Sequence, residues 1–369
     1  MKKIIWIPLV ILIIGVCIAL AGFTNGGFKG IWVDRAGFHL GDYANGSAGN
    51  LVTVDENYDS FKSIVINADY FDHVVLKEGS GYSVRGQNYE RYGGLDVNLD
   101  GDTIRVESRA DRRWRINMGL DHVLQTSDTW LEITYPAGMG DRNVEINLSA
   151  GDISVTNLNA GFINIDNSFG NTSLTSVKSD KMVISAAAGK ISMTDIALSG
   201  GAEALVITND FGDVELKNIT SGELTADLKS GRLKASEITA GAVNLSNDFG
   251  KIEINALEAK SLSADLSAGD LQADGVTVNG LTVKSDFGKV VFDRLVFTGI
   301  CDINNKSGDV ELNLLMSRDD VSYELKTDAG SVSVNGEKSS GSVSSRNAGS
   351  TVNLNARTDF GSVRVEFLK

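Results

Sequence analysis

From residue 149 onward a short turn signature ending in glycine returns again and again, and this repeat limits the fold more than any other feature. Most of the glycines lie nineteen residues apart: Gly151, Gly170, Gly189, Gly212, Gly231, Gly250, Gly269, Gly288, Gly308, Gly330, Gly349 and Gly361. A fixed period of this length is typical of solenoids, in which each repeat packs only against its neighbours. We therefore expect a repetitive stack.

Within each unit, apolar residues recur at fixed offsets from the glycine. After Gly212 they are Val214, Leu216, Ile219, Leu224 and Ala226. Residues two apart face the same side of a strand, so each unit is predicted to hold two short strands, with inward residues at about +2, +4, +12 and +14 and the +7 residue closing the connection. Parallel stacking of equivalent strands at about 4.8 Å would bury a continuous apolar ladder. The prediction is an all-β parallel β-solenoid, or β-helix, of about 19-residue two-strand units.

A second period of about 38 residues lies over the first, because the residue before glycine alternates between phenylalanine and a small residue. We interpret the phenylalanines as structural core corners and the glycines as structural turns, the latter because glycine tolerates positive φ. The corner residues are Phe169, Phe211, Phe249 and Phe287, and the turn residues are Gly212, Gly231, Gly250, Gly269 and Gly288. Either one unit forms a coil and large and small corners alternate, or two units form a coil and phenylalanine stacks on phenylalanine.

The tripeptide Asp-Phe-Gly occurs four times, beginning at Asp210, Asp248, Asp286 and Asp359. A single copy would suggest a kinase, but the other kinase motifs are missing. We expect a turn in which the aspartate caps backbone N–H groups, the phenylalanine fills a corner and the glycine takes positive φ. Calcium binding is disfavoured because the aspartates are replaced in other units, and no metal or other cofactor is expected.

The N-terminus carries a targeting signal. Lys2 and Lys3 precede an uncharged run, Ile4–Phe23, that is long enough to cross a bilayer of roughly 30 Å as a helix. The positive-inside rule predicts a single-pass protein of the cell membrane, with its N-terminus inside and its C-terminal domain outside. The alternatives are secretion after signal cleavage near Ala19-Leu20-Ala21 and, more weakly, a lipoprotein through Cys17.

The chain is accordingly divided into three parts. Residues 1–24 form the transmembrane anchor or uncleaved signal, residues 25–50 a Gly-rich juxtamembrane stalk, and residues 51–369 the solenoid. Within the solenoid, residues 51–148 read as an irregular opening section that caps the stack. The tripeptide Asp100-Gly101-Asp102 marks a hairpin there. Residues 149–369 are regular repeats that fade to a C-terminal cap, and the alternating segment Val363–Phe367 is expected to finish the stack.

One basic cluster interrupts the opening section, with four arginines around a tryptophan. Guanidinium groups pair with phosphate and stack on aromatic rings, so the cluster is a candidate contact for an anionic polymer or lipid head groups. The alternative is a solvated loop that offsets the acidic surface. The candidate ligand-binding residues are Arg109, Arg112, Arg113, Trp114 and Arg115.

Charge and residue usage disfavour several classes of function. A formal net charge of −14 argues against nucleic acid as a partner, because phosphate binding needs a basic face. Cys17 and Cys301 are not expected to pair, and Cys301 falls at an inward position of the repeat. The three histidines, His39, His73 and His122, precede the repeat and share no motif. A polysaccharide-active β-helix enzyme is the main catalytic alternative, but it would need acids that converge in one groove. No catalytic residues are predicted.

Several segments together resemble a known bacterial family. They are the N-terminal anchor, Gly26–Gly30, Asp100–Ile104, Leu131–Pro136 and the Gly-Asp-Ile/Val turns at Gly151, Gly212 and Gly308. This pattern is similar to the bacterial putative-adhesin family of unknown function, which includes membrane-anchored proteins of the LiaG type associated with cell-envelope stress operons. The resemblance implies a β-solenoid exposed outside a membrane and supplies no catalytic residues.

The function expected from the sequence is a non-catalytic, adhesin-like binding or structural module at the bacterial cell envelope. Its partners would be the membrane, through the N-terminal helix, and a cell-wall polymer or an envelope protein. A regulatory or sensory accessory of an envelope-stress system is the alternative, and the enzyme is a weaker one.

Overall fold

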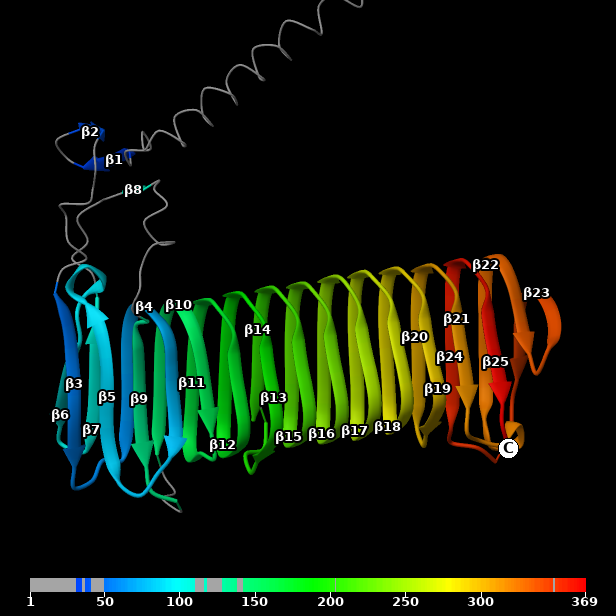
Figure 1. The fold of residues 1–369 in the computed structure, drawn as a ribbon. Coiled ribbons are helices and arrows are strands. Elements are labelled where there is room, and N and C mark those ends of the chain that lie inside the picture. The colour runs from blue at the N-terminus through cyan, green and yellow to red at the C-terminus, as the bar shows by residue number, and fades with distance from the viewer. Residues whose placement is uncertain are drawn as a thin grey trace, which may run out of the picture.

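The protein forms a long stack of β-coils capped by irregular strands at both ends (Figure 1). The computed structural model describes residues 31–34, 37–40, 50–109, 116–117, 128–137, 142–202, 204–347 and 349–369. A sheet of 22 strands runs through the whole stack. A separate three-stranded sheet holds β1 (Ile31–Asp34), β2 (Gly37–Leu40) and β8 (Ile116–Asn117).

The regular middle of the stack consists of parallel strands in which each residue lies beside the residue of the next unit. Val214 pairs with Leu233, Leu233 with Ile252, and Ile252 with Leu271, always nineteen residues on. One 19-residue unit therefore makes one coil, which decides between the two arrangements that the sequence leaves open. The strands are β10 (Asn143–Thr156), β11 (Asn159–Phe169), β12 (Thr172–Ala188), β13 (Ile191–Leu198), β14 (Leu205–Phe211), β15 (Val214–Ser230), β16 (Leu233–Phe249), β17 (Ile252–Ala268), β18 (Leu271–Phe287), β19 (Val290–Phe297), β20 (Ile300–Ser307) and β21 (Val310–Leu314).

Each coil has three inward-facing segments where the sequence predicts two. In β15 the buried residues are Val214 and Leu216, then Ile219 and Ser221, then Leu224, Ala226 and Leu228. The +7 residue is thus a member of a ladder of its own, and Ile219 pairs in register with Ile238. A corner with positive φ precedes it in coil after coil, and most of the residues there are not glycine: Asn157, Ser176, Asp195, Asn218, Glu237, Ala256 and Arg294.

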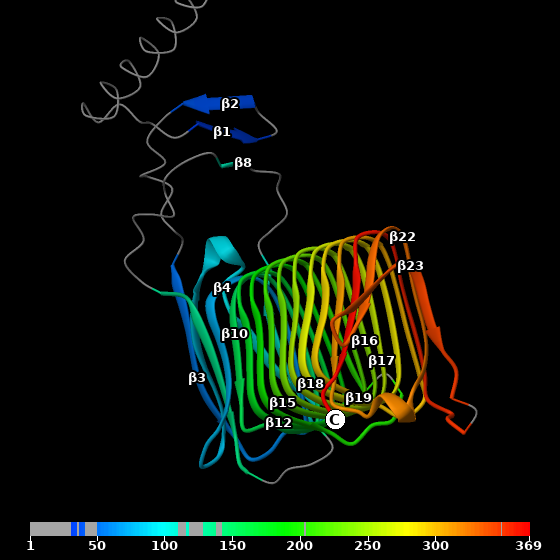
Figure 2. The same ribbon diagram turned by 90° about the vertical axis from the view of Figure 1, so that its right-hand side faces the viewer.

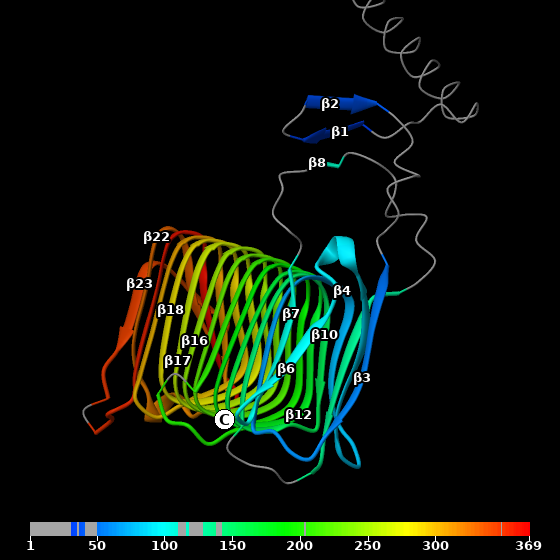
Figure 3. The same ribbon diagram turned by 90° about the vertical axis from the view of Figure 1, so that its left-hand side faces the viewer.

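At the N-terminal end the order of strands in the stack departs from their order in the chain. β4 (Ser63–Glu78) pairs with β10 on one side and with β7 (Thr103–Ser108) and β9 (Trp130–Tyr135) on the other, all in parallel. The earlier strand therefore lies between two later coils. Three antiparallel strands complete this end (Figure 3): β3 (Leu51–Tyr58), β5 (Tyr82–Tyr89) and β6 (Asp96–Asp100). The hairpin predicted at Asp100–Asp102 is present between β6 and β7, with Gly101 at φ 63°.

The C-terminal end departs from the chain order in a similar way. β24 (Asn353–Phe360) and β25 (Val363–Phe367) lie between the β20–β21 coil and β22 (Ser322–Val334). The expectation that Val363–Phe367 finishes the stack is therefore wrong, because this segment occupies the last coil but one. The stack is closed by β23 (Glu337–Ser345), which pairs with β22 in the antiparallel sense (Figure 2). The described residues also hold two 3-10 turns, Glu90–Tyr92 and Arg318–Asp320.

The core is one continuous apolar column inside the coils. Isoleucine, leucine and valine dominate it and are almost all fully buried. Cys301 belongs to this column as predicted, between Leu281 and Leu354 in the ladder. Burial raises the pKa of its thiol far above the usual range, which keeps it protonated and unreactive.

Among the described residues, no helix has the length and apolar character needed to cross a bilayer. The predicted span Ile4–Phe23 lies outside these residues. The division into anchor and stalk therefore stays a prediction.

Candidate functional site: the phenylalanine corner

The corner formed by the repeated turn signature carries a row of exposed aromatic rings. Phe169, Phe211, Phe249, Phe287 and Phe360 are 61–68% exposed, while the residues two positions before them are buried or nearly so. They are among the most exposed large apolar side chains in the described part of the chain. Their prediction as core corners is therefore wrong.

The corner residues form a ladder that alternates strictly between an aromatic and a small residue. Strand register places neighbours at this position side by side, and we call this series the corner ladder. Its twelve described rungs are, in stack order, Tyr70, Ala150, Phe169, Ala188, Phe211, Ser230, Phe249, Ala268, Phe287, Ser307, Phe360 and Ala329. With strands about 4.8 Å apart, successive aromatic rungs stand about 9.6 Å apart.

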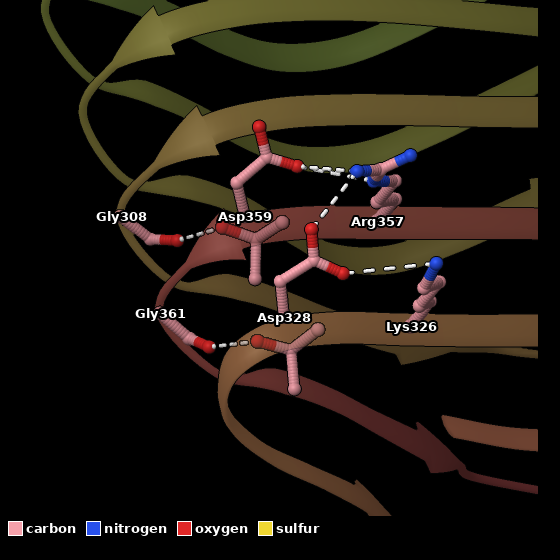
Figure 4. A network of polar contacts seen from close by, with 8 residues as sticks. Gly308, Lys326, Asp328, Arg357, Asp359 and Gly361 are labelled. Atoms are coloured by element: carbon pink, nitrogen blue, oxygen red, sulfur yellow. Dashed lines mark hydrogen bonds and ion pairs between the residues drawn. The ribbon is translucent and has the colours of Figure 1, made fainter. Parts of the chain in front are cut away.

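The phenylalanines point outward because another side chain already fills the inside of the corner. Asn209, two residues before Phe211, is buried and its Nδ2 donates to the carbonyl oxygen of Gly189 in the preceding coil at 3.0 Å. Asn167, Asn247 and Asn305 make the same contact with Gly151, Gly231 and Gly288. Thr358 and Thr327 do so through their hydroxyl groups, to Gly308 and Gly361 (Figure 4).

Two features of the coil account for the outward direction of the ring. Alternation along the strand would place the corner residue on the same face as Asn209, but the chain turns at Gly212 and ends the alternation there. The inward position two residues before the corner holds a polar residue in the Phe-containing units and leucine in others such as Leu228. In both kinds of unit this side chain fills the interior of the corner. The ring then has no space inside.

The corner glycines are required by close backbone approach as well as by φ. Gly250 has φ 139°, and a Cβ placed on it would lie 1.9 Å from the carbonyl oxygen of Gly231. The other four predicted turn glycines have φ between 136° and 151°, and a Cβ on each would meet the carbonyl oxygen of the corner glycine in the preceding coil. No other residue fits this position without displacing the preceding coil.

The aspartate that caps backbone N–H groups is the one after the glycine, so the expectation that the aspartate before the phenylalanine does so is wrong. Asp213 Oδ1 accepts from the backbone N–H of Arg232 at 2.9 Å, and Asp270 does the same for Lys289. That backbone hydrogen bond, aided by the Arg232 side chain, holds the pKa of Asp213 below its usual value despite partial burial.

Asp210, Asp286 and Asp359 instead form ion pairs along the ladder, and Asp248 accepts a hydrogen bond from the Ser267 hydroxyl. Asp210 lies 2.6 Å from Lys229, and Asp286 lies 2.6 Å from Lys306. At the last phenylalanine rung, Arg357 contacts both Asp328, at 3.1 Å, and Asp359, at 2.9 Å (Figure 4). The ladder is thus flanked by acids at four of its five Phe rungs and by lysines at two of its small rungs.

The predicted basic cluster is only partly within the described residues. Arg109 follows β7 with an exposed side chain, and its Nε lies 3.6 Å from Glu107. It lines a shallow polar hollow with Asn147, Asp166 and Ser168. Arg112, Arg113, Trp114 and Arg115 lie outside the described residues, so their grouping stays a prediction.

In the described part of the chain, no three side chains of the histidine, cysteine, aspartate or glutamate type are placed to hold a metal ion. A polar hollow between β22, β23 and β24 is lined mainly by serine and asparagine, with Glu324 and Arg346. Two groups of opposite charge do not make the paired acids that glycoside hydrolysis needs.

The stacked parallel coils and the glycine corner define a repetitive β-solenoid. The profile of the Toastrack DUF4097 family matches residues 61–245 and 240–368, and the chain belongs to this family. This confirms the resemblance to an adhesin-like family of unknown function.

Solved structures with some likeness to the chain are distant. A putative adhesin from Bacteroides fragilis is 16% identical, with a TM-score of 0.37, and the match covers 69% of this chain and 97% of that one. A putative adhesin from Parabacteroides distasonis is 10% identical, with a TM-score of 0.32 and coverage of 68% and 97%. A putative lipid binding protein from the same organism is 11% identical, with a TM-score of 0.32 and coverage of 69% and 96%. No curated protein matches the sequence.

Proposed function

We propose that this protein is a non-catalytic, adhesin-like binding or structural module on the outer side of a bacterial cell membrane. The observation that supports the proposal most is the row of exposed phenylalanines along a stack of coils with a continuous core. Small-molecule sites are usually concave and apolar. A surface that repeats from coil to coil instead distributes its contacts along the length of the stack, as solenoid binding surfaces do.

The N-terminal sequence supplies the location in this proposal. Lys2 and Lys3 before the apolar run Ile4–Phe23 favour an anchor whose positive end stays in the cytoplasm. The stack would then stand outside the membrane, or in the medium if the segment is cleaved.

The basic cluster supplies one contact in the proposal. Within the described residues, Arg109 has a side chain that is 60% exposed, and its Nε lies 3.6 Å from Glu107. In this proposal its guanidinium binds an anionic envelope polymer, together with the arginines that follow it.

One experiment on intact cells tests location and contact together. The full chain carries a C-terminal tag after Lys369, and a second version has Arg109, Arg112, Arg113 and Arg115 changed to Ser. We expect protease added outside to remove the tag in both versions, and we expect the variant to be retained several-fold less by isolated cell walls. Arg364→Ser, which removes an exposed arginine from β25, is the matched control and should be retained like the parent.

The two outcomes are independent. A tag that is protected until the cells are lysed would contradict the location. Equal wall retention of the parent and the four-arginine variant would remove the cluster as the contact.

A further inference from the structure

The corner ladder forms a regular apolar edge that the described residues leave exposed. Its five phenylalanines stand in one line, each separated from the next by an alanine or a serine. An isolated exposed apolar side chain needs no explanation, but a contiguous row of this kind marks an interaction surface. The question is which partner has a matching period.

A second copy of the same chain has the matching period by construction. We propose that two copies associate in antiparallel orientation along the corner ladder, with each phenylalanine of one copy resting on a small rung of the other. The number of rungs makes this possible over the full length. In twelve alternating rungs, reversal of one copy places every aromatic rung opposite a small rung.

The two-fold axis of this pair would pass between the Ser230 and Phe249 rungs. Ser230 of one copy then faces Phe249 of the other, and Phe211 faces Ala268. A parallel pair in full register would instead place ring against ring at every second rung and leave gaps between. The interface is therefore self-complementary only in the antiparallel sense, as in an isologous two-fold contact.

The charges beside the ladder match in the same register. Lys229, which flanks the Ser230 rung, would face Asp248, which flanks the Phe249 rung, and the axis generates this contact twice. Asp286 would face Ala187, and Lys306 would face Ser168. Over these central rungs no like charges meet, and like charges across an interface are what would oppose the pairing.

The area available agrees with a reversible contact. A phenylalanine offers roughly 200 Å² of surface, and the five rings keep 61–68% of theirs exposed. The rings alone could then bury up to about 650 Å² per copy, just below the 800 Å² or so per partner of a standard interface. We expect a dimer that forms and dissociates with concentration.

The orientation has a consequence that rests on the proposed function. The two caps of the stack lie at opposite ends (Figure 1), so an antiparallel pair has its two N-terminal ends at opposite ends as well. If both chains are membrane-anchored, such a pair would join two facing surfaces, which is homophilic adhesion.

Cross-linking of the purified full chain in lipid nanodiscs tests the register. Cys17→Ser leaves the buried Cys301 as the remaining native cysteine, and Lys306→Cys or Ser168→Cys is added separately, because these two positions face each other far from the two-fold axis. We expect a mixture of the two variants to cross-link about tenfold faster than either variant alone. Lys306→Cys cross-linking with itself would overturn the antiparallel arrangement, which keeps the two copies of this position several strand spacings apart.

Sedimentation of the full chain in lipid nanodiscs tests the association. The variant with all five phenylalanines changed to Ser should stay monomeric at concentrations where the parent pairs, with an unchanged far-ultraviolet circular dichroism spectrum. Ile300→Ser, which removes a side chain that is 59% exposed and off the ladder, is the control and should pair normally. A parent chain that stays monomeric throughout, or that associates only with added lipid vesicles or wall glycan, would overturn the proposal. These results leave the location experiment unaffected, so the two proposals can fail separately.

Discussion

At the scale of single residues, the corner is decided by which atoms fit between neighbouring coils. The backbone of each corner glycine lies so close to the glycine of the preceding coil that a Cβ has no room. The inward asparagine or threonine binds the carbonyl oxygen there, and the phenylalanine is left outside. The second corner of the coil accepts residues with side chains. Ala256 and Arg294 adopt φ of 59° and 50° at the position that Gly275 occupies in its own coil.

This contrast gives a matched pair of substitutions. Gly250→Ala would place its Cβ 1.9 Å from the carbonyl oxygen of Gly231. We expect it to lower the free energy of unfolding by more than about 3 kcal/mol. Gly275→Ala has no neighbour nearer than 3.6 Å, and its effect should stay within about 1 kcal/mol. Urea unfolding followed by circular dichroism measures both, and equal effects would contradict the close approach at the corner.

Sequence reasoning reached the inward ladder but missed the direction of the ring. The offsets of Val214, Leu216 and Leu224 follow from alternation along a strand, which is a local property and is visible in one unit. The exposure of Phe211 depends on where the coil bends and on what Asn209 already fills. Both depend on the preceding coil, and a periodic pattern does not report on that contact.

At the scale of elements, both ends of the stack are fixed by strands out of chain order. β4 lies between β10 and the later strands β7 and β9. β24 and β25 lie between the β20–β21 coil and β22, which precedes them in the chain. At each end, strands from separate parts of the chain are therefore hydrogen-bonded to each other. This arrangement was beyond sequence reasoning, because the pattern of β25 would fit as well against any parallel coil. The hairpin at Asp100–Asp102 was predictable because its turn residues are local.

The junction of β4 with β9 carries a pH-dependent contact at this end. Asp72 Oδ2 accepts from the backbone N–H and the hydroxyl of Thr129 at 2.7 and 2.9 Å. Burial by itself would raise the pKa of Asp72, but the hydrogen bonds from Tyr70 and Thr129 outweigh it and hold the pKa below its usual value. A carboxyl group with a lowered folded-state pKa stabilises the fold above its unfolded pKa, and that contribution is lost as the pH falls through the folded value.

Asp72→Asn should therefore cost stability at neutral pH and little in acid. We expect a loss of about 1 kcal/mol at pH 7, since the group is partly exposed. The difference from the parent should shrink as the pH is lowered through the pKa of Asp72. Asp59→Asn, which removes an exposed acid near the end of β3, is the control for a change of one charge. Urea unfolding at a series of pH values measures the difference, and a gap that widens in acid would contradict the assignment.

At the scale of the whole molecule, the central claim is that one 19-residue unit makes one coil. This register sets the alternation of the corner ladder, the spacing of its rings and the fit of a second copy. The period itself was read from the sequence, and so were the all-β class and the parallel stacking. The number of units per coil was not, because 19 and 38 residues are both periods of the same pattern. The pairing between strands distinguishes them, for example that of Thr225 with Asn244 and of Asn244 with Ser263.

Disulfide trapping measures this register most directly. In a chain with Cys17→Ser, the pair Thr225→Cys and Asn244→Cys is 19 residues apart and lies on neighbouring strands, within the reach of a disulfide. The pair Thr225→Cys and Ser263→Cys is 38 residues apart and is separated by one strand. We predict that mild oxidation of dilute protein closes the first pair within one chain and leaves the second reduced. Closure of the second pair without the first would show two units to a coil and contradict the account.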